Sequence, residues 1–92
     1  MNKYSEAEAI EATGALEDWE LIDNRIRKTF VFANFVEAFG FMAKVAILAE
    51  RADHHPEWSN VYKIVNIELT THEAGGLTEK DVSLAAEIDG LS

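Results

Sequence analysis

The sequence predicts one α+β domain over residues 1–92, in which a four-stranded antiparallel sheet carries three helices packed on one face in the order α-β-β-α-β-β-α. Two observations predict this class. Runs with a period of two come in pairs, and stretches with helical periodicity separate those pairs. The pair Glu57-Trp58 also echoes Asp18-Trp19, which indicates a weak duplication of a hairpin. A chain of 92 residues has room for a single domain with a small core.

The first part of the chain predicts a helix and then a hairpin. Ser5 opens the S-x-x-E pattern of a capping box, and Gly14 is a suitable end for the helix that begins there. Strands are expected over residues 19–22 and 26–32, with a polar turn between them. Within the second strand the apolar residues share one face, and Lys28 is the exception on that face.

A long helix is expected from an N-cap at Asn34 to about Ala52. Two apolar stripes follow its surface. The first is expected to cover the sheet and consists of Phe35, Phe39, Met42, Ala46 and Ala49. The second needs another partner and consists of Phe41, Val45 and Leu48. We expect that partner to be a second copy of the chain, and the alternative is that the N-terminal helix covers the stripe.

The second part of the chain predicts another hairpin and a last helix. The only proline, Pro56, precedes this hairpin, and residues 65–69 alternate apolar and polar side chains, as in a half-buried antiparallel strand. The pair Gly75-Gly76 ends the hairpin region. Thr78 is expected to cap the last helix.

The charge and the composition exclude several classes of protein. Eight Lys and Arg stand against 17 Asp and Glu, which gives a net charge of −9 and argues against binding to nucleic acid or to anionic membranes. The most apolar stretch, residues 30–49, contains Asn34, Glu37 and Lys44 and is too interrupted for a membrane span. The N-terminus lacks the pattern of a signal peptide, and there is no cysteine, so we expect a cytoplasmic protein.

The three histidines lie close together in the sequence and have acids around them: His54, His55 and His72, with Glu50, Asp53 and Asp81. Histidine gives and takes protons near neutral pH, so the group indicates acid/base chemistry or metal binding. Two members have structural alternatives. His54 can cap the helix before it, and Asp81 can complete a capping box with Thr78.

Metal binding is the weaker of these two interpretations. Adjacent histidines such as His54 and His55 point their rings in different directions and seldom bind one ion together, and the spacing H-E-x-x-H is absent. Nucleophilic catalysis is weaker still, because Ser59 and Ser83 lack a G-x-S-x-G context. We therefore expect no metal site.

Taken in order, these residues give the pattern E-x3-HHP-x5-Y-x9-H-x8-D, from Glu50 to Asp81. The pattern resembles the signature of the pterin-4a-carbinolamine dehydratases, a family also known as the dimerisation cofactor of a hepatocyte homeodomain transcription factor. Residues 56–62, 71–72 and 76–78 are similar as well. The resemblance implies an enzyme that dehydrates 4a-hydroxytetrahydropterin to quinonoid dihydropterin, and so recycles the cofactor of aromatic amino-acid hydroxylases. It implies no metal and no cofactor bound by the enzyme itself.

The resemblance also implies roles for single residues. His54 and His72 would exchange protons with the substrate, and which of them is acid and which is base stays open. His55 would bind the polar edge of the pterin, and Asp81 would orient a histidine. The residues expected to bind or position the substrate are Glu50, Asp53, Pro56, Trp58 and Lys80. Trp58 has a structural alternative as an ordinary strand aromatic. Lys80 stands where many members have Arg, and Ala74 where animal members often have Cys.

Members of this family are homodimers or homotetramers, so the resemblance implies a homo-oligomer that forms through the 34–52 helix or a sheet edge.

Two other functions compete with the enzyme. One is an interaction module that stabilises the dimer of a protein partner through Phe41, Val45 and Leu48. The other is a maturation factor with a non-pterin ligand, because acid/base residues alone do not specify a bicyclic ring.

Overall fold

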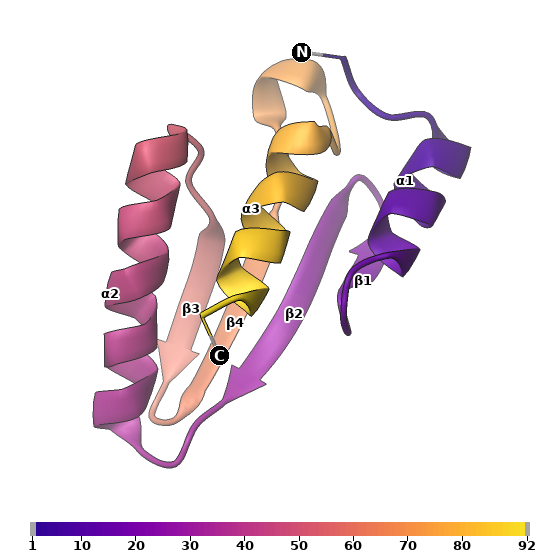
Figure 1. Cartoon of the computed structure of the whole chain (residues 1–92). Coiled ribbons are helices and arrows are strands. Elements are labelled where there is room, and N and C mark those ends of the chain that lie inside the picture. The colour runs from indigo at the N-terminus through magenta and orange to yellow at the C-terminus, as the bar shows by residue number, and fades with distance from the viewer. Residues whose placement is uncertain (1, 92) are drawn as a thin grey trace.

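The computed structural model describes residues 2–91 and confirms the predicted class (Figure 1). Helices α1, α2 and α3 lie on one face of the sheet, and the other face is open. The elements, in chain order, are α1 (Glu6–Gly14), β1 (Glu20–Ile22), β2 (Arg25–Val31), α2 (Phe35–Ala52), β3 (Glu57–Val61), β4 (Ile64–Leu69), the 3-10 helix η1 (His72–Ala74) and α3 (Glu79–Asp89).

The sheet has the strand order β1-β2-β4-β3, and every neighbouring pair is antiparallel. In the central pair, Ile26 is opposite Leu69 and Phe30 is opposite Val65. These residues point toward the helices and are buried, because successive residues of a strand face opposite sides of the sheet. The alternating pattern read from residues 65–69 is therefore confirmed.

All three predicted helix starts are confirmed by their caps. The Ser5 hydroxyl accepts a hydrogen bond from the Glu8 amide at 3.1 Å, which forms the predicted capping box. The Asn34 side chain caps α2 by accepting from the Glu37 amide at 2.9 Å. Thr78 caps α3, again in a capping box. Each cap satisfies amide groups that the first turn of a helix leaves without partners.

The assignment of the two stripes on α2 is wrong for their phenylalanines, although Ala49 of the first stripe is buried as expected. Phe41 and Val45, from the stripe expected to need a partner, are 6% and 0% exposed and face the core. Phe35 and Phe39, from the stripe expected to cover the sheet, are 49% and 59% exposed. The reason lies at the end of β2, because the ring of Phe30 on this strand and the ring of Phe32 just after it each lie 4.8 Å from the Phe41 ring, measured between centroids.

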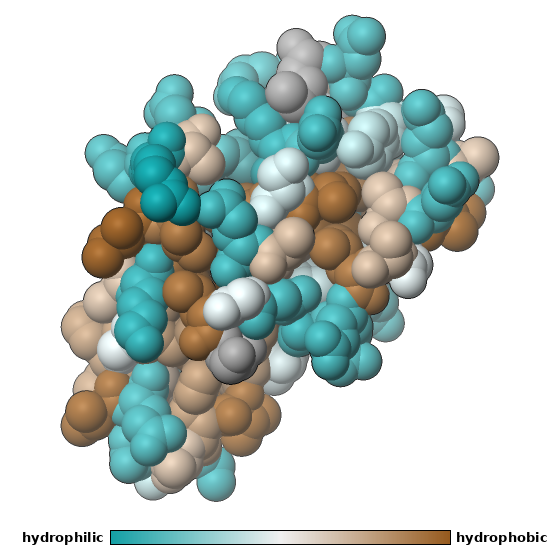
Figure 2. Space-filling view, viewed as in Figure 1, coloured by the Kyte–Doolittle hydropathy of each residue, from teal (hydrophilic) through white to brown (hydrophobic). Residues whose placement is uncertain are grey.

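The stripe that contains Phe41 is thus covered by this chain's own sheet, and α1 packs against β1 instead of covering it. Apolar side chains gather over α2 on the surface of the molecule (Figure 2). The large exposed ones on this helix are Phe35, Val36, Phe39 and Ile47.

The chain after β4 also differs from expectation. The sequence patterns did not predict the short helix η1, which fills most of the interval between Leu69 and the glycine pair. Thr71 forms an isolated antiparallel bridge with Gly76, and Gly75 closes the turn with a φ of 82°, a value that favours glycine. This turn positions His72. Within residues 2–91, no helix is long and apolar enough to cross a membrane.

Candidate functional site

His54 lies where the chain leaves the last turn of α2. Asp53 ends the helix in a left-handed conformation with a φ of 50°, and the His54 amide donates to the carbonyl of Ala49 at 3.0 Å. This reversal turns the imidazole inward, where only 10% of the side chain is exposed. His54 Nε2 lies 2.5 Å from Oδ1 of Asp81, on the first turn of α3. The His54 side chain is therefore paired with a carboxylate, and does not merely cap α2.

Asp81 is completely buried and has partners for both oxygens. Oδ1 contacts His54, while Oδ2 accepts from the Thr71 hydroxyl at 2.8 Å and from the Thr78 amide at 2.9 Å. The bond from Thr78 is the second half of the capping box. The capping role of Asp81 is therefore confirmed through Oδ2, while Oδ1 is the atom that contacts a histidine.

The other two histidines lie on the surface, and each has its own carboxylate. His55 Nε2 lies 3.0 Å from Oε1 of Glu50, and His72 Nε2 lies 3.0 Å from Oε1 of Glu57 at the start of β3. Glu57 is also 3.5 Å from a guanidinium nitrogen of Arg25 on β2. A hydrogen bond from Arg25 to Glu68 raises the pKa of the guanidinium, which is charged in proteins in any case.

The fold brings the two histidine segments together through two contacts. Glu57, just after His54-His55-Pro56, meets His72, while the Asp81 carboxylate links His54 to Thr71. The expectation that adjacent histidine rings diverge is confirmed, because His54 is buried and His55 is exposed. Paired with carboxylates, imidazoles can hold a defined orientation and move protons.

A hollow of about 330 Å³ opens beside His54, between the end of α2 and the outer side of α3. Lys80 and Glu79 lie on its wall with Ser83. This volume is at the lower end of the range for small-molecule sites. Of the residues expected to bind substrate, Lys80 is the one that shares this hollow with His54.

The remaining candidates lie outside that lining. Trp58 packs against the hydrophobic core, as the structural alternative for it predicted, while Pro56 is partly buried. Asp53 is exposed at the end of α2, and Glu50 is exposed beside His55. Among the described residues, no group of three or more His, Asp or Glu side chains is arranged to hold a metal ion.

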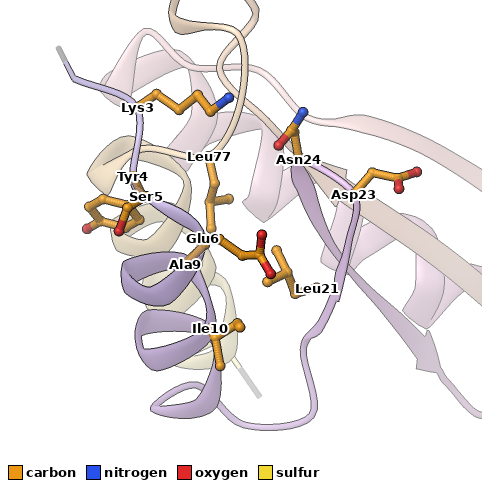
Figure 3. Close-up of a pocket in the computed structure, with 10 residues that line it drawn as sticks. All are labelled: Lys3, Tyr4, Ser5, Glu6, Ala9, Ile10, Leu21, Asp23, Asn24 and Leu77. Atoms are coloured by element: carbon orange, nitrogen blue, oxygen red, sulfur yellow. The ribbon is translucent and has the colours of Figure 1, made fainter.

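A second hollow, of about 530 Å³, lies between α1, the β1–β2 turn and Leu77 (Figure 3). Lys3 and Asn24 lie at one end of it, and Glu6 and Leu21 lie further along. The Tyr4 amide donates to the Leu77 carbonyl at 2.8 Å, which ties the N-terminal segment to the loop before α3. Burial, followed by the nearby Glu79 carboxylate, raises the pKa of Tyr4.

Sequence reasoning missed three residues that contact the candidate site: Thr71, Glu57 and Arg25. Glu57 follows the His-His-Pro segment directly, so its place beside a histidine could have been considered. Thr71 lies in a segment that resembles the family, but its contact with Asp81 depends on a turn that was not predicted. Arg25 comes from another strand and is brought to Glu57 only by the strand order.

Comparisons with known proteins point to one family. The model of the family described as pterin 4 alpha carbinolamine dehydratase matches residues 2–91. A protein from Jannaschia sp. (strain CCS1), which carries the provisional name pterin-4-alpha-carbinolamine dehydratase, is 53% identical over 94 residues, covering 98% of this chain and 96% of that protein. A relative from Roseobacter denitrificans with the same provisional name is 58% identical over 76 residues, covering 80% of this chain and 78% of the relative.

Two solved structures are similar as well. A crystal structure of a transcriptional coactivator/pterin dehydratase from Brucella melitensis has a TM-score of 0.94 and 42% identity, with 98% of each chain covered. A pterin dehydratase-like protein described as a RuBisCO assembly factor in the alpha-carboxysome has a TM-score of 0.69 and 26% identity, covering 82% of this chain and 89% of its own. With a family model over nearly its whole length and close relatives of matching size, this chain belongs to the pterin 4 alpha carbinolamine dehydratase family.

Proposed function

We propose that this chain is a hydro-lyase that converts 4a-hydroxytetrahydropterin to quinonoid dihydropterin and water by histidine acid/base catalysis. The observation that carries the proposal is that all three histidines of a chain in this family have carboxylate partners, at Asp81, Glu50 and Glu57. The reaction breaks the C4a–O bond. The leaving hydroxyl gains a proton and departs as water, N5 loses its proton, and a C4a=N5 double bond forms.

In this proposal His54 and His72 exchange these two protons with the substrate. Either imidazole can serve as acid or as base near neutral pH, and a positioned group of this kind contributes roughly 10²–10⁴-fold. Asp81 orients His54, since it is buried and lies 2.5 Å from the ring. The His55 imidazole, which is exposed beside Glu50, binds the polar edge of the pterin.

Substrate binding in this proposal uses residues around the histidines. Lys80 holds the pterin from the wall of the hollow next to His54. The other residues proposed to bind or position it are Glu50, Asp53, Pro56 and Trp58. Lys is a flexible point charge, so it constrains the ring less than the arginine common in the family. The pathway we propose is cytoplasmic recycling of a tetrahydropterin cofactor.

The test is a dehydration assay with 4a-hydroxytetrahydropterin generated in situ and quinonoid dihydropterin followed by absorbance. His72→Ala should lose most of the acceleration given by the wild-type chain, by at least about 10²-fold. The control is Glu73→Ala, a change at the next residue, which is exposed on the same turn. It should leave the rate unchanged.

Two results would count against the proposal. A folded wild-type chain that does not accelerate the reaction would reject the pterin substrate. A His72→Ala chain that is as fast as the wild type would reject the catalytic role of His72, but it would not reject the pterin substrate.

A second candidate is an interaction or assembly role, either with a protein partner or as a maturation factor for a ligand that is not a pterin. Two observations favour it: the RuBisCO assembly factor is a structural relative, and α2 exposes Phe35, Phe39 and Ile47. Such a role would use this outer face of α2, and not the core-facing Phe41 stripe as the sequence suggested. We also propose that the face joins copies of this chain into a homo-oligomer, with a sheet edge as the alternative contact.

A further inference from the structure

The Asp81 carboxylate is the centre of a buried group of polar side chains. Its exposed fraction is 0%, and its neighbours Thr78 and Thr71 are 0% and 4% exposed. A charge at such a position requires hydrogen-bond donors on both oxygens, because water cannot supply them. The Thr71 hydroxyl and the Thr78 amide donate to Oδ2, and Nε2 of His54 lies against Oδ1.

The direction of these hydrogen bonds can be worked out atom by atom. Thr71 Oγ1 lies 2.8 Å from Asp81 Oδ2 and 2.8 Å from Thr78 Oγ1, and it has one hydrogen to give. A carboxylate can only accept, so Thr71 donates to Asp81 and accepts from Thr78. Thr78 Oγ1 in turn accepts from the Lys80 amide at 3.2 Å, which leaves its own hydrogen free for Thr71. The hydroxyl hydrogens therefore point in one sequence, from Thr78 to Thr71 to Asp81.

The carboxylate then bears on which nitrogen of His54 carries a hydrogen. An ionised carboxylate accepts on both oxygens, and with Oδ2 occupied by the Thr71 hydroxyl and the Thr78 amide, Oδ1 is the oxygen left to accept from His54. Nε2 must then carry a hydrogen. When the ring is neutral, Nδ1 is the bare nitrogen, and Nδ1 is the atom that can take up or release a proton.

We propose that Thr71 is a positioning residue which, with Thr78 behind it, holds Asp81 so that His54 keeps its Nε2–H form and exchanges protons through Nδ1. The proposal deepens the proposed function and rests on it for the catalytic consequence. Thr71 can hold the carboxylate because its own backbone is held independently: its amide donates to the Gly76 carbonyl at 3.1 Å, and its carbonyl accepts from the Gly76 amide at 3.2 Å.

The same turn serves a second histidine. Thr71 points its hydroxyl inward to Asp81, and the next residue, His72, reaches Glu57 on the exposed side. The conformation of this turn thus sets the position of His72 and, through Thr71 and Asp81, the orientation of His54.

The experiment compares Thr71→Val, which keeps the shape and removes the hydroxyl, with Thr71→Ser, which restores it. Thr70→Val is the matched control, since the Thr70 hydroxyl donates to the Asn24 carbonyl and has no contact with Asp81. Long-range proton–nitrogen NMR correlation spectra distinguish the two nitrogens of the His54 ring. Dehydration rates are measured in parallel on the same samples.

In the wild type and in Thr70→Val, the spectrum should show hydrogen on Nε2 and a bare Nδ1 in the neutral ring. Thr71→Val should give a mixture of the two forms and lower the dehydration rate about tenfold, the size expected for one hydrogen bond to a charged group. Thr71→Ser should restore both the spectrum and the rate.

A bare Nε2 in the wild-type spectrum would overturn the proposal even if Thr71→Val failed to fold. A Thr71→Val spectrum identical to that of the wild type would overturn it as well. Because the spectrum needs no substrate, a wild type with the expected form but no dehydration would count against the pterin reaction and still support the positioning by Thr71.

Discussion

Lys28 shows how one residue that breaks the sequence pattern can connect distant parts of the chain. It lies on the apolar face of β2, with only 15% of its side chain exposed. Its Nζ atom is 2.8 Å from Oδ1 of Asp89 at the end of α3, donates to the Glu17 carbonyl at 2.7 Å, and lies 4.9 Å from the centre of the Phe30 ring. Trp19 Nε1 donates to the other oxygen of Asp89 at 3.0 Å.

Removal of this cation should destabilise the protein, because the largely buried Asp89 carboxylate would lose the charge of Lys28. We expect Lys28→Ala to lower the free energy of unfolding by about 2–3 kcal/mol, below the usual cost for a fully buried pair since some solvent reaches this one. The measurement is denaturant unfolding. Arg27→Ala is the control, because its pair with Glu20 is exposed and should contribute at most about 1 kcal/mol. Equal losses in the two variants would contradict the argument.

At the scale of the element, α2 shows where sequence reasoning succeeds and where it stops. Its start, its end and the presence of two apolar stripes follow from local signals, namely the Asn34 cap and helical spacing. Which stripe faces inward depends on contacts with Phe30 and Phe32 from another element. The pairing of Asp81 with a histidine could be expected from the family resemblance, whereas its link to Thr71 depends on the turn closed by the Thr71–Gly76 bridge, which was not predicted.

The corrected assignment gives a matched pair of variants on one helix. Phe41→Ser should lower the free energy of unfolding by at least about 3 kcal/mol, since Phe41 is buried between two aromatic rings. Phe39→Ser should change the stability of the single chain by less than about 0.5 kcal/mol, because the ring is 59% exposed.

If the outer face of α2 joins copies of the chain, sedimentation velocity should show a smaller species for Phe39→Ser than for the wild type. An unchanged sedimentation profile would exclude this face as the contact and favour a sheet edge.

At the scale of the whole molecule, charge repulsion competes with local ion pairs. The chain carries eight basic and 17 acidic residues. Its surface pairs include Arg51–Glu87 at 2.7 Å and Arg27–Glu20 at 3.3 Å, and such exposed pairs each contribute between zero and about 1 kcal/mol. The excess of acidic residues acts in the opposite direction, because like charges repel one another across a compact surface.

Added salt weakens both effects, so its net influence shows which of them is larger. With a net charge of −9, repulsion should dominate, and sodium chloride raised from a few millimolar to about 0.15 M should increase the melting temperature. Each kcal/mol gained corresponds to about 4–8 °C for a domain of this size. The Phe39→Ser chain at low concentration is the suitable sample, since salt can also favour association of an acidic protein and so mimic the effect. A melting temperature that falls with salt would mean that the ion pairs outweigh the repulsion between acidic residues. Within residues 2–91, Lys28–Asp89 is the most buried of the pairs formed by lysine or arginine.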